Sequence, residues 1–394
     1  MEKMEKYKIA IFSGEIPPAT FVNRLIIGLA ERKVQLLLVG HLKKKVSYPF
    51  DNIKIVGYSG RISKLWLFLK YSFLLLLYKS KDKRKLDLWI DKNAKNKILA
   101  KIRFYPILYF QPDIFHLQWV KSIADWVWVK EFNIKLVVSL RGSHINYTPI
   151  CQPEFATIYK QYFPFVDGFH GVSATIIKEA LAYNADGEKS KVVYSGLNLE
   201  KFTYTTNKID SKPLQIISVG RSHWVKGYRY ALDAMRILKE NNIKFSYTII
   251  GVEEEEELLF QRAQLDLQEE VVFEKTLPFQ EVLERIKVAN VLVLPSLEEG
   301  IANVVLEAMA LGTLVVSTNC GGMSEVIQHQ ENGFLVPTRN PQEMAEAIVA
   351  ITKMTPEHYQ NSARNARKKI EENHSEIKMI DDMLTLYTTV CESK

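Results

Sequence analysis

Short apolar runs alternate with amphipathic helical runs along nearly the whole chain. The apolar runs are rich in Val, Ile and Leu and end at Gly or polar residues, as in YKIAIF (7–12), KLVVSL (135–140) and ANVLVLP (289–295). Strands that are buried on both faces have this composition, and parallel strands are joined by helical crossovers. The sequence therefore predicts an α/β fold, built from βα units around parallel sheets.

The alternation is interrupted once. Residues 203–213, TYTTNKIDSKP, are polar and aperiodic, which is typical of a linker. A chain of 394 residues is long enough for two or three domains. We therefore expect an N-terminal domain over residues 1–202 and a C-terminal domain over residues 214–374.

Composition indicates an ordinary globular protein of a reducing compartment. Hydrophobic residues make up 47% of the chain, which supports a full core and excludes wholesale disorder. The three cysteines are far apart and form no CxxC pair, which argues against a disulfide framework or a zinc site. The N-terminal residues lack the regions of a signal peptide, so we expect a cytoplasmic protein.

Positive charge is concentrated near one segment. Residues 43–103 hold 17 Lys and Arg against 4 Asp and Glu, a net charge of +13. Within them, residues 61–85 combine an apolar stretch with a basic cluster, and the apolar stretch is too short to span a membrane. A core helix with a solvated basic end is one interpretation; an in-plane helix on anionic lipid is the one we favour. The candidate membrane residues are Lys64, Trp66, Lys70, Lys79, Lys81, Lys83, Arg84 and Lys85.

A cationic loop follows the strand-like run LQIISVG (214–220). The loop GRSHWVKG (220–227) places Arg221 and Lys226 where ligands bind in open α/β sheets, beyond the carboxyl end of a strand. Two cations next to a helix N-terminus suit a diphosphate. The loop has neither a Walker nor a GxGxxG pattern, and an ordinary solvated βα loop is the alternative interpretation.

Two carboxylates flank a second loop, in EEGIANVVLEAMALG (298–312). Glu307 is the one polar residue in an otherwise apolar helical run, and Glu299 precedes Gly300 in the loop. We expect Asn303 to cap this helix and Glu307 to lie in its first turn. Because carboxylates accept hydrogen bonds from hydroxyl pairs, the two acids and the cationic loop together suggest a nucleotide and a sugar.

Several motifs together resemble the retaining GT-B glycosyltransferases of family 4, the glycosyl transferases group 1. The signature of that family is two glutamates separated by seven residues, here Glu299 and Glu307, and GRSHWVKG and ENGFLVP match its other C-terminal motifs. Upstream, DIFHLQW, YSGLNLEKF and PPATFVNRLIIGLAERK resemble further segments, the last of them from bacterial exopolysaccharide members. The resemblance implies two Rossmann-like, doubly wound parallel-sheet domains facing a central cleft. It also implies that a C-terminal helix, about residues 375–394, packs back on the N-terminal domain.

The resemblance implies roles for residues of the C-terminal domain. Arg221 and Lys226 would bind the donor's diphosphate and assist its departure, Glu299 would contact the donor sugar, and Glu307 would accept hydrogen bonds from ribose. No metal or other cofactor is expected, because the family needs none and the chain has no D-x-D motif. The remaining donor-site candidates are Gly220, Ala302, Asn303 and Val304.

The N-terminal domain departs from the family pattern. Arg141 occupies the position of the family's His after KLVVSL, and Gln118 replaces the second His of its D-x-x-H-x-H strand. His116 remains, and it is consistent with either a site role or a structural one. The candidate sugar or acceptor contacts are Gly14, Glu15, His116, Arg141 and His144.

The resemblance predicts a retaining glycosyltransferase. It would move a hexose-type sugar from a UDP- or GDP-sugar to a hydroxyl of a lipid-linked or polysaccharide acceptor. Two alternatives remain: a GT-B protein that binds donor without turnover, and a nucleotide-sugar epimerase of the same fold. We expect an anionic membrane surface as a partner, at the inner face of the cell membrane. We expect no nucleic acid, because the aliphatic density of the basic segment suits lipid better.

Overall fold

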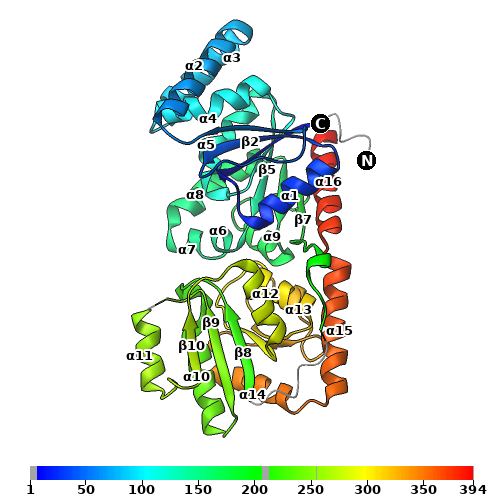
Figure 1. Ribbon diagram of the computed structural model, residues 1–394. Coiled ribbons are helices and arrows are strands. Elements are labelled where there is room, and N and C mark those ends of the chain that lie inside the picture. The colour runs from blue at the N-terminus through cyan, green and yellow to red at the C-terminus, as the bar shows by residue number, and fades with distance from the viewer. Residues whose placement is uncertain (1–6, 206–212, 254, 394) are drawn as a thin grey trace. The chain divides into compact units, whose positions relative to one another are not determined.

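The computed structural model describes residues 7–205, 213–253 and 255–393, which form two compact units. Among these residues, unit 1 comprises 7–172, 176–193 and 377–393, and unit 2 comprises the remainder. Each unit is a parallel sheet with helices on both faces (Figure 1). The predicted α/β fold with two Rossmann-like sheets is confirmed. Most of the predicted linker, residues 206–212, lies outside the described residues.

The sheet of unit 1 has the strand order β3-β2-β1-β4-β5-β6-β7. Strand β1 therefore lies where the chain reverses its direction of travel across the sheet, which is the topological switch point of a doubly wound fold. The strands are β1 (Lys8–Ile16), β2 (Gln35–Leu42), β3 (Ile53–Tyr58), β4 (Ile114–Leu117), β5 (Lys135–Leu140), β6 (Gly168–Gly171) and β7 (Ser190–Val192).

Both faces of this sheet are covered by apolar side chains. Along β1, Ala10 and Phe12 point into one core cluster, while Ile9 and Ile11 point into the other. Side chains alternate between the faces of a strand, so a strand that is apolar throughout must be covered on both sides. The helices of unit 1 are α1 (Thr20–Glu31), α2 (Arg61–Tyr78), α3 (Ser80–Asn93), α4 (Lys97–Phe110), α5 (Ile123–Trp126), α6 (Gly142–Asn146), α7 (Thr148–Cys151), α8 (Pro153–Tyr162), α9 (Ala174–Leu181) and α16 (Glu376–Glu392).

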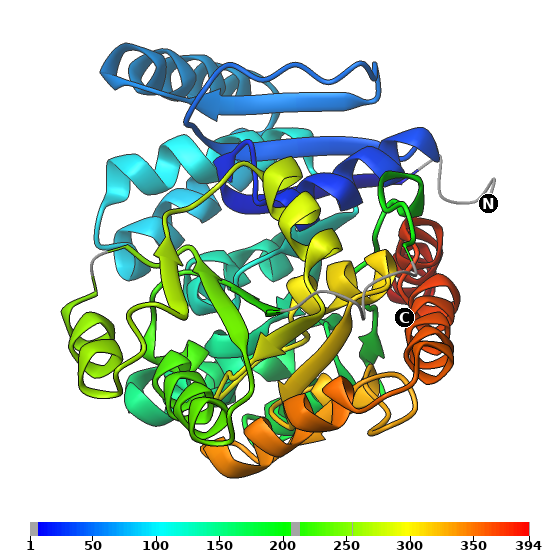
Figure 2. The same cartoon turned by 60° about the horizontal axis from the view of Figure 1, so that its bottom comes forward.

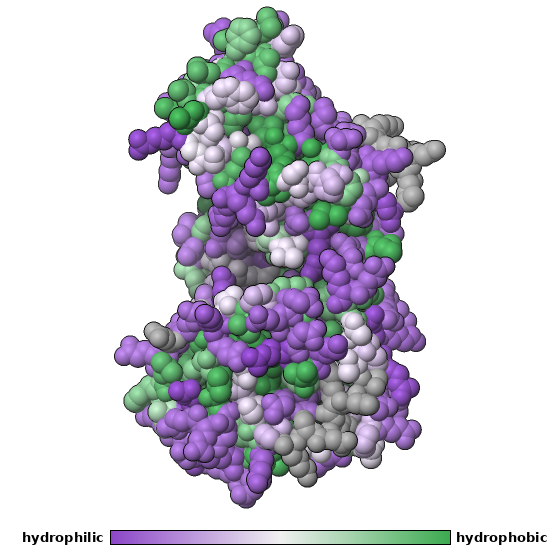
Figure 3. All heavy atoms as spheres, viewed as in Figure 1, coloured by the Kyte–Doolittle hydropathy of each residue, from purple (hydrophilic) through white to green (hydrophobic). Residues whose placement is uncertain are grey.

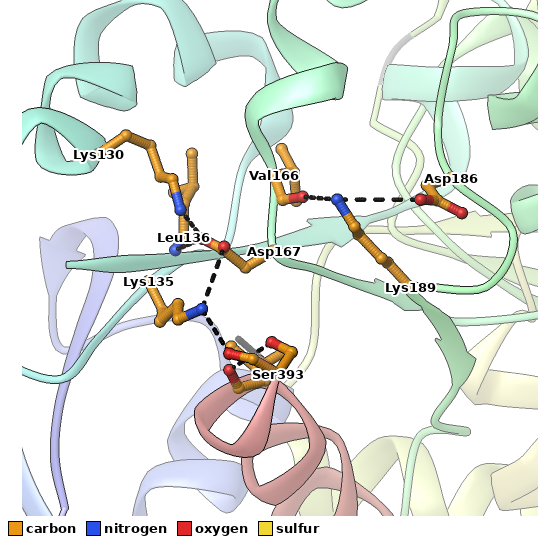
Figure 4. A network of polar contacts seen from close by, with 9 residues as sticks. Lys130, Lys135, Leu136, Val166, Asp167, Asp186, Lys189 and Ser393 are labelled. Carbon is orange, nitrogen blue, oxygen red and sulfur yellow. Dashed lines mark hydrogen bonds and ion pairs between the residues drawn. The ribbon is translucent and has the colours of Figure 1, made fainter. Parts of the chain in front are cut away.

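Helix α16 lies beside α1 on one face of the unit 1 sheet (Figure 1). Gly28 of α1 allows this close approach, because a Cβ atom there would lie 2.5 Å from the side chain of Ile380. The end of the chain is also tied to β5: Lys135 Nζ donates to the carbonyl of Ser393 at 2.9 Å and lies 3.8 Å from Asp167 Oδ1 (Figure 4). Asp167 in turn accepts from the backbone of Leu136 and from Lys130.

Helices α2 and α3 project from unit 1 next to β3 (Figures 1 and 2). The inner face of α2 packs on the core through Leu67, Tyr71 and Leu75, which recur every four residues. At the start of α2, Ser63 Oγ accepts the backbone N–H of Gly60 at 3.0 Å. Among the described residues, no helix is long and apolar enough to cross a membrane.

Unit 2 repeats the same topology, with the strand order β10-β9-β8-β11-β12-β13. Strand β8 is at the switch point, between β9 and β11. The strands are β8 (Leu214–Val219), β9 (Phe245–Ile250), β10 (Val271–Glu274), β11 (Val291–Leu294), β12 (Leu314–Thr318) and β13 (Phe334–Val336). The helices are α10 (Tyr228–Glu240), α11 (Glu256–Gln264), α12 (Phe279–Val288), α13 (Asn303–Leu311), α14 (Pro341–Thr352) and α15 (Pro356–Asn373).

Candidate donor and acceptor sites

Two loops of unit 2 meet at its topological switch point. The loop 220–227 follows β8, and the loop 295–302 follows the neighbouring strand β11. The backbone N–H of Leu297 donates to the carbonyl of Val225 at 2.7 Å, which fixes one loop against the other. The carboxyl ends of adjacent strands at a switch point form the usual ligand-binding crevice of an open α/β sheet.

Glycines let three backbone segments approach closely at this edge. Gly227 has a φ of +64° and precedes α10, and a Cβ atom on it would lie 2.1 Å from the carbonyl oxygen of Pro295. Gly321, with a φ of +50°, would place a Cβ atom 1.8 Å from the carbonyl oxygen of Glu299. The loop that carries Glu299 is therefore held between two glycine backbones, and no other residue type fits at either position without movement.

Lys226 and Glu299 form an ion pair across the two loops. Lys226 Nζ lies 2.6 Å from Glu299 Oε1, and the side chains are only 19% and 15% exposed. Ser296 Oγ donates to the same carboxylate oxygen at 2.9 Å. The sequence-predicted diphosphate ligand and the predicted sugar contact are thus brought together at one point. At this low exposure the pair is better shielded from solvent than a surface ion pair.

Arg221 lies in the same loop as Lys226, and its side chain is exposed. Its charge reaches His223: the pKa of His223 is lowered by burial first, and then by the charges of Arg221 and Lys226. His223 Nδ1 accepts the backbone N–H of Val225 at 3.3 Å, so this imidazole shapes the loop. The loop after β8 therefore presents two cations and a neutral imidazole at the sheet edge.

Helix α13 follows the Glu299 loop and differs from the sequence prediction in two details. Its N-cap is Ala302, in an extended conformation with no side-chain cap, and Asn303 is its first residue. The Oδ1 atom of Asn303 is buried without a hydrogen-bond partner. The expectation that Asn303 caps the helix was wrong, because the carbonyl of Ala302 already accepts the first helical bond, from Val305 N at 3.0 Å.

Glu307 is the fifth residue of α13, which places it in the second turn rather than in the first turn as expected. Its side chain is 8% exposed, in a helix whose residues from Val305 to Leu311 are all buried. Gly220 begins the loop after β8, Ala302 ends the loop after β11, and Val304 is the second residue of α13. The structure therefore groups the donor-site candidates around the ends of β8 and β11.

In unit 1, His116 lies inside the core rather than at a surface. It is fully buried in β4, with Nδ1 2.6 Å from the hydroxyl of Tyr387 in α16 and Nε2 2.8 Å from Ser139 Oγ. Ser139 Oγ also lies 2.9 Å from His170 Nδ1. Burial is the main reason that the pKa of His116 is well below its usual range. Sequence reasoning missed Tyr387, whose position 271 residues away leaves no local signal.

The other candidates of unit 1 lie at the carboxyl ends of its central strands. Arg141 follows β5, and one guanidinium nitrogen, Nη2, donates to Gln118 Oε1 at 2.8 Å. His144 lies in α6 and packs edge-on against Trp119 at 5.6 Å. Gly14 has a φ of +80°, and Glu15 pairs with Lys43 at 2.6 Å. Trp119 also lies beside Arg141, whose guanidinium carbon is 5.8 Å from its ring centre, whereas the Glu15 carboxylate pairs with a lysine.

In the basic cluster that follows α2, some cations have polar or acidic partners and others are exposed. Lys79 Nζ donates to the carbonyl of Leu108 and to Gln111, and burial lowers its pKa. Lys83 pairs with Asp87 at 2.7 Å, and Lys85 with Glu131 at 3.4 Å. Of the eight candidate membrane residues, Lys70, Lys81 and Arg84 are exposed and form no ion pair among the described residues, and Lys64 is half-buried over the ring of Tyr58.

Two Rossmann-like units of this topology define a GT-B glycosyltransferase fold. A crystal structure of Anabaena Alr3699/HepE in complex with UDP matches with a TM-score of 0.72 at 14% sequence identity, covering 97% of this chain and 100% of that chain. At this identity the match shows the fold alone.

The chain is also similar in sequence to known glycosyltransferases. Residues 203–369 match the model of the glycosyl transferases group 1. The chain is 27% identical over 293 residues to the putative colanic acid biosynthesis glycosyltransferase WcaL of Escherichia coli (strain K12), covering 72% of each chain. It is 30% identical over 254 residues to the amylovoran biosynthesis glycosyltransferase AmsK of Erwinia amylovora, covering 62% of each. The chain is a glycosyltransferase, and its residues 203–369 match the group 1 family that the motifs resemble.

Proposed function

We propose that the protein transfers a hexose-type sugar from a nucleoside diphosphate sugar, with UDP or GDP as the leaving group, and retains the anomeric configuration. The observation that carries this proposal is the Lys226–Glu299 ion pair at the switch point of unit 2. A cation and a carboxylate 2.6 Å apart offer one group for the diphosphate and one for the sugar hydroxyls.

Stabilisation of the departing diphosphate is the main catalytic contribution in this proposal. Lys226 is positioned by the loop contacts around it, and Arg221 adds a second cation that can bridge two phosphate oxygens. Charges that are fixed in place before the reaction stabilise a developing anion without reorganising. Glu307, in the second turn of α13, would accept the ribose hydroxyls.

We propose that this site works without a metal ion. The support is that Arg221, Lys226 and the start of α13 lie near the ends of β8 and β11, where they would neutralise a diphosphate in place of a metal ion. Among the described residues, no group of three or more His, Cys, Asp or Glu side chains could hold a metal ion. Addition of a chelator is therefore expected to leave turnover unchanged.

We propose a lipid-linked or polysaccharide acceptor. The names of WcaL and AmsK place those relatives in the biosynthesis of colanic acid and amylovoran, and HepE binds UDP in its crystal structure. These properties belong to the relatives, and they support the same classes of donor and acceptor here.

We also propose that unit 1 docks on an anionic membrane surface from the cytoplasmic side. The outer face of α2 exposes a stripe of apolar side chains at helical spacing, and Figure 3 shows apolar residues over this part of the unit. A stripe of this kind beside exposed cations is typical of an interfacial helix. The stripe consists of Ile62, Leu65, Trp66, Leu69, Phe73, Leu76 and Leu77, each at least 57% exposed.

Product analysis distinguishes this function from its two alternatives. The full chain is incubated with UDP- and GDP-sugars and with saccharide or lipid-linked acceptors, and products are followed by NMR. The proposal predicts a new glycosidic bond with the anomeric configuration of the donor. A free or nucleotide-bound epimeric sugar would indicate an epimerase, and donor binding without any product would indicate a non-catalytic protein.

A further inference from the structure

Arg141 lies at the carboxyl edge of unit 1, where β4 and β5 end side by side. Its guanidinium carbon lies 4.4 Å from the ring centre of Phe21 and 5.8 Å from that of Trp119. The two rings are themselves 6.0 Å apart and nearly perpendicular. Trp119 Nε1 donates to the carbonyl of Ser13 at 2.9 Å, which fixes this indole. The guanidinium therefore lies in a rigid aromatic corner.

The hydrogen-bond partner of Arg141 carries no charge. Arg141 Nη2 donates to the amide oxygen of Gln118. The side chain of Gln118 is fully buried, and its Nε2 lies 3.1 Å from His116 Nδ1. The Nε atom of Arg141 is buried and has no hydrogen-bond partner. Because a buried donor without an acceptor is costly, this arrangement leaves an unmet need for an acceptor.

The pKa of Arg141 is affected by burial and not by a neighbouring carboxylate. Burial lowers the pKa of Arg141 to about 9, and no neighbouring carboxylate acts in the opposite direction. Arg141 thus keeps its charge at neutral pH, but among the described residues it has no counter-ion. His144 is affected similarly: burial first, then the charges of Lys121 and Arg141, lower its pKa to about 4. Its Nδ1 is also buried without a partner.

We propose that Arg141 binds an anionic group of the acceptor saccharide. The planar guanidinium matches a carboxylate or a phosphate, and the rings of Phe21 and Trp119 offer apolar faces against which a sugar packs. The anion is the carboxylate of a uronic acid or the phosphate at the reducing end of an activated saccharide. His144 Nδ1 offers a second polar contact at the same edge. This inference rests on the proposed glycosyl transfer and specifies its acceptor as acidic.

Binding measurements test this inference separately from turnover. The full chain is saturated with UDP, so that the donor site is filled, and then titrated with three probes. Methyl β-D-glucuronide carries the carboxylate, glucose 1-phosphate carries the phosphate, and methyl β-D-glucoside is the neutral control. We expect at least one anionic probe to bind about tenfold or more tightly than the neutral glucoside. The probe that binds more tightly shows whether the recognised anion is the carboxylate or the phosphate.

Substitutions assign the anion preference to one side chain. Arg141→Met keeps the length of the side chain, removes the charge, and is expected to abolish the preference. Lys121→Met removes a neighbouring cation whose Nζ lies 5.4 Å from the ring of Phe155, and it is expected to keep the preference. Equal binding of all three probes to the wild-type chain, or a preference that survives in Arg141→Met, overturns the proposal.

A spectroscopic readout in the wild-type chain covers the case in which Arg141→Met does not fold. The ¹⁵Nε–¹H resonance of Arg141 is expected to shift on addition of the anionic probe that binds, because Nε gains an acceptor. The neutral glucoside is expected to leave it in place. An unchanged Arg141 resonance at saturating anionic probe overturns the proposal. Failure of the proposed glycosyl transfer, in contrast, would leave these binding results intact.

Discussion

Lys226 Nζ lies 2.6 Å from Glu299 Oε1, so that the loop after β8 and the loop after β11 are joined by one ion pair. The same carboxylate accepts a hydrogen bond from Ser296 at 2.9 Å. Glu299 therefore supplies a negative charge to Lys226. In the proposed function, the donor's diphosphate would compete with this carboxylate for the same lysine.

This competition predicts opposite effects of Glu299→Gln on binding and on turnover. Removal of the competing carboxylate is expected to tighten UDP binding by about threefold to tenfold. Loss of the sugar contact is expected to lower kcat by about tenfold or more. Calorimetry and steady-state kinetics measure the two quantities. The same substitution at the neighbouring Glu298 is the control and is expected to change neither; a Glu299→Gln enzyme with normal kcat would rule out the sugar contact.

Helix α16 is anchored to the unit 1 sheet by the hydrogen bond between Tyr387 and His116. Both side chains are fully buried, and the oxygen and Nδ1 lie 2.6 Å apart. Tyr387→Phe leaves His116 Nδ1 without this partner and is expected to lower the free energy of unfolding by about 1–3 kcal/mol. Urea denaturation measures the change. Tyr183→Phe, at a half-buried tyrosine, is expected to cost less than about 0.5 kcal/mol; equal effects would show that the Tyr387 bond contributes nothing.

Buried histidines predict a loss of stability in mild acid. Burial is the main cause that lowers the pKa of His374 to about 4 and that of His170 to about 3. The pKa of a histidine in the unfolded chain is about 6.5. Below that pH the histidines of the unfolded chain bind protons, whereas these two histidines in the folded chain stay neutral. The free energy of unfolding is therefore expected to fall by about 1.4 kcal/mol per pH unit for each such histidine as the pH drops from about 6.5 to 4.

Urea denaturation between pH 7.5 and pH 5 measures this dependence, and stability should be flat above about pH 7.5. In the folded chain His374 Nδ1 lies 3.3 Å from the carbonyl of Ser195. His374→Gln retains a hydrogen-bonding side chain but cannot titrate, so its slope should be smaller. A wild-type urea midpoint that stays constant down to pH 5 would show that these imidazoles do not titrate on unfolding.

The apolar stripe of α2 predicts membrane association that depends on two properties. The wild-type chain is expected to sediment with vesicles containing phosphatidylglycerol and much less with pure phosphatidylcholine vesicles. Leu69→Glu combined with Phe73→Glu places charge in the stripe, where both side chains are more than half exposed, and is expected to release the protein.

The control for the α2 variant is Phe260→Glu, in α11 of unit 2, where the side chain is 63% exposed. It should bind vesicles like the wild type. Unchanged sedimentation of the α2 double variant would contradict docking through this helix. Equal binding to both kinds of vesicle would contradict only the electrostatic part, to which the exposed side chains of Lys70, Lys81 and Arg84 are expected to contribute.

Local patterns predicted the sheets and the loops of the donor site, because strand composition, glycine positions and charge are properties of short segments. Gly220 and Gly227 bound the cationic loop as expected. The cap of α13 was misplaced by one residue, because Ala302 takes the extended cap conformation without needing a side-chain acceptor. No feature of the sequence distinguishes Ala302 from Asn303 as the cap residue.

Contacts between distant residues could not be predicted in this way. Tyr387 meets His116 across 271 positions, and Lys79 donates to the carbonyl of Leu108 in α4 and to Gln111. Such pairs depend on how helices pack on the sheet, and periodicity carries no record of that packing. The division of the basic cluster into paired and exposed cations was invisible in the sequence for the same reason.

The proposed function depends on binding of the donor's diphosphate by Lys226, which nucleotide titration measures. Calorimetric titration of the full chain compares UDP with uridine, or GDP with guanosine if the wild type prefers GDP, so that the phosphate contribution is isolated. Lys226→Ala should weaken diphosphate binding by roughly tenfold to a hundredfold and leave nucleoside binding unchanged. The control is Lys239→Ala in α10, where the lysine pairs with Glu270 at 3.0 Å, and it should change neither affinity. A Lys226→Ala protein that binds the nucleoside diphosphate as tightly as the wild type would contradict the account.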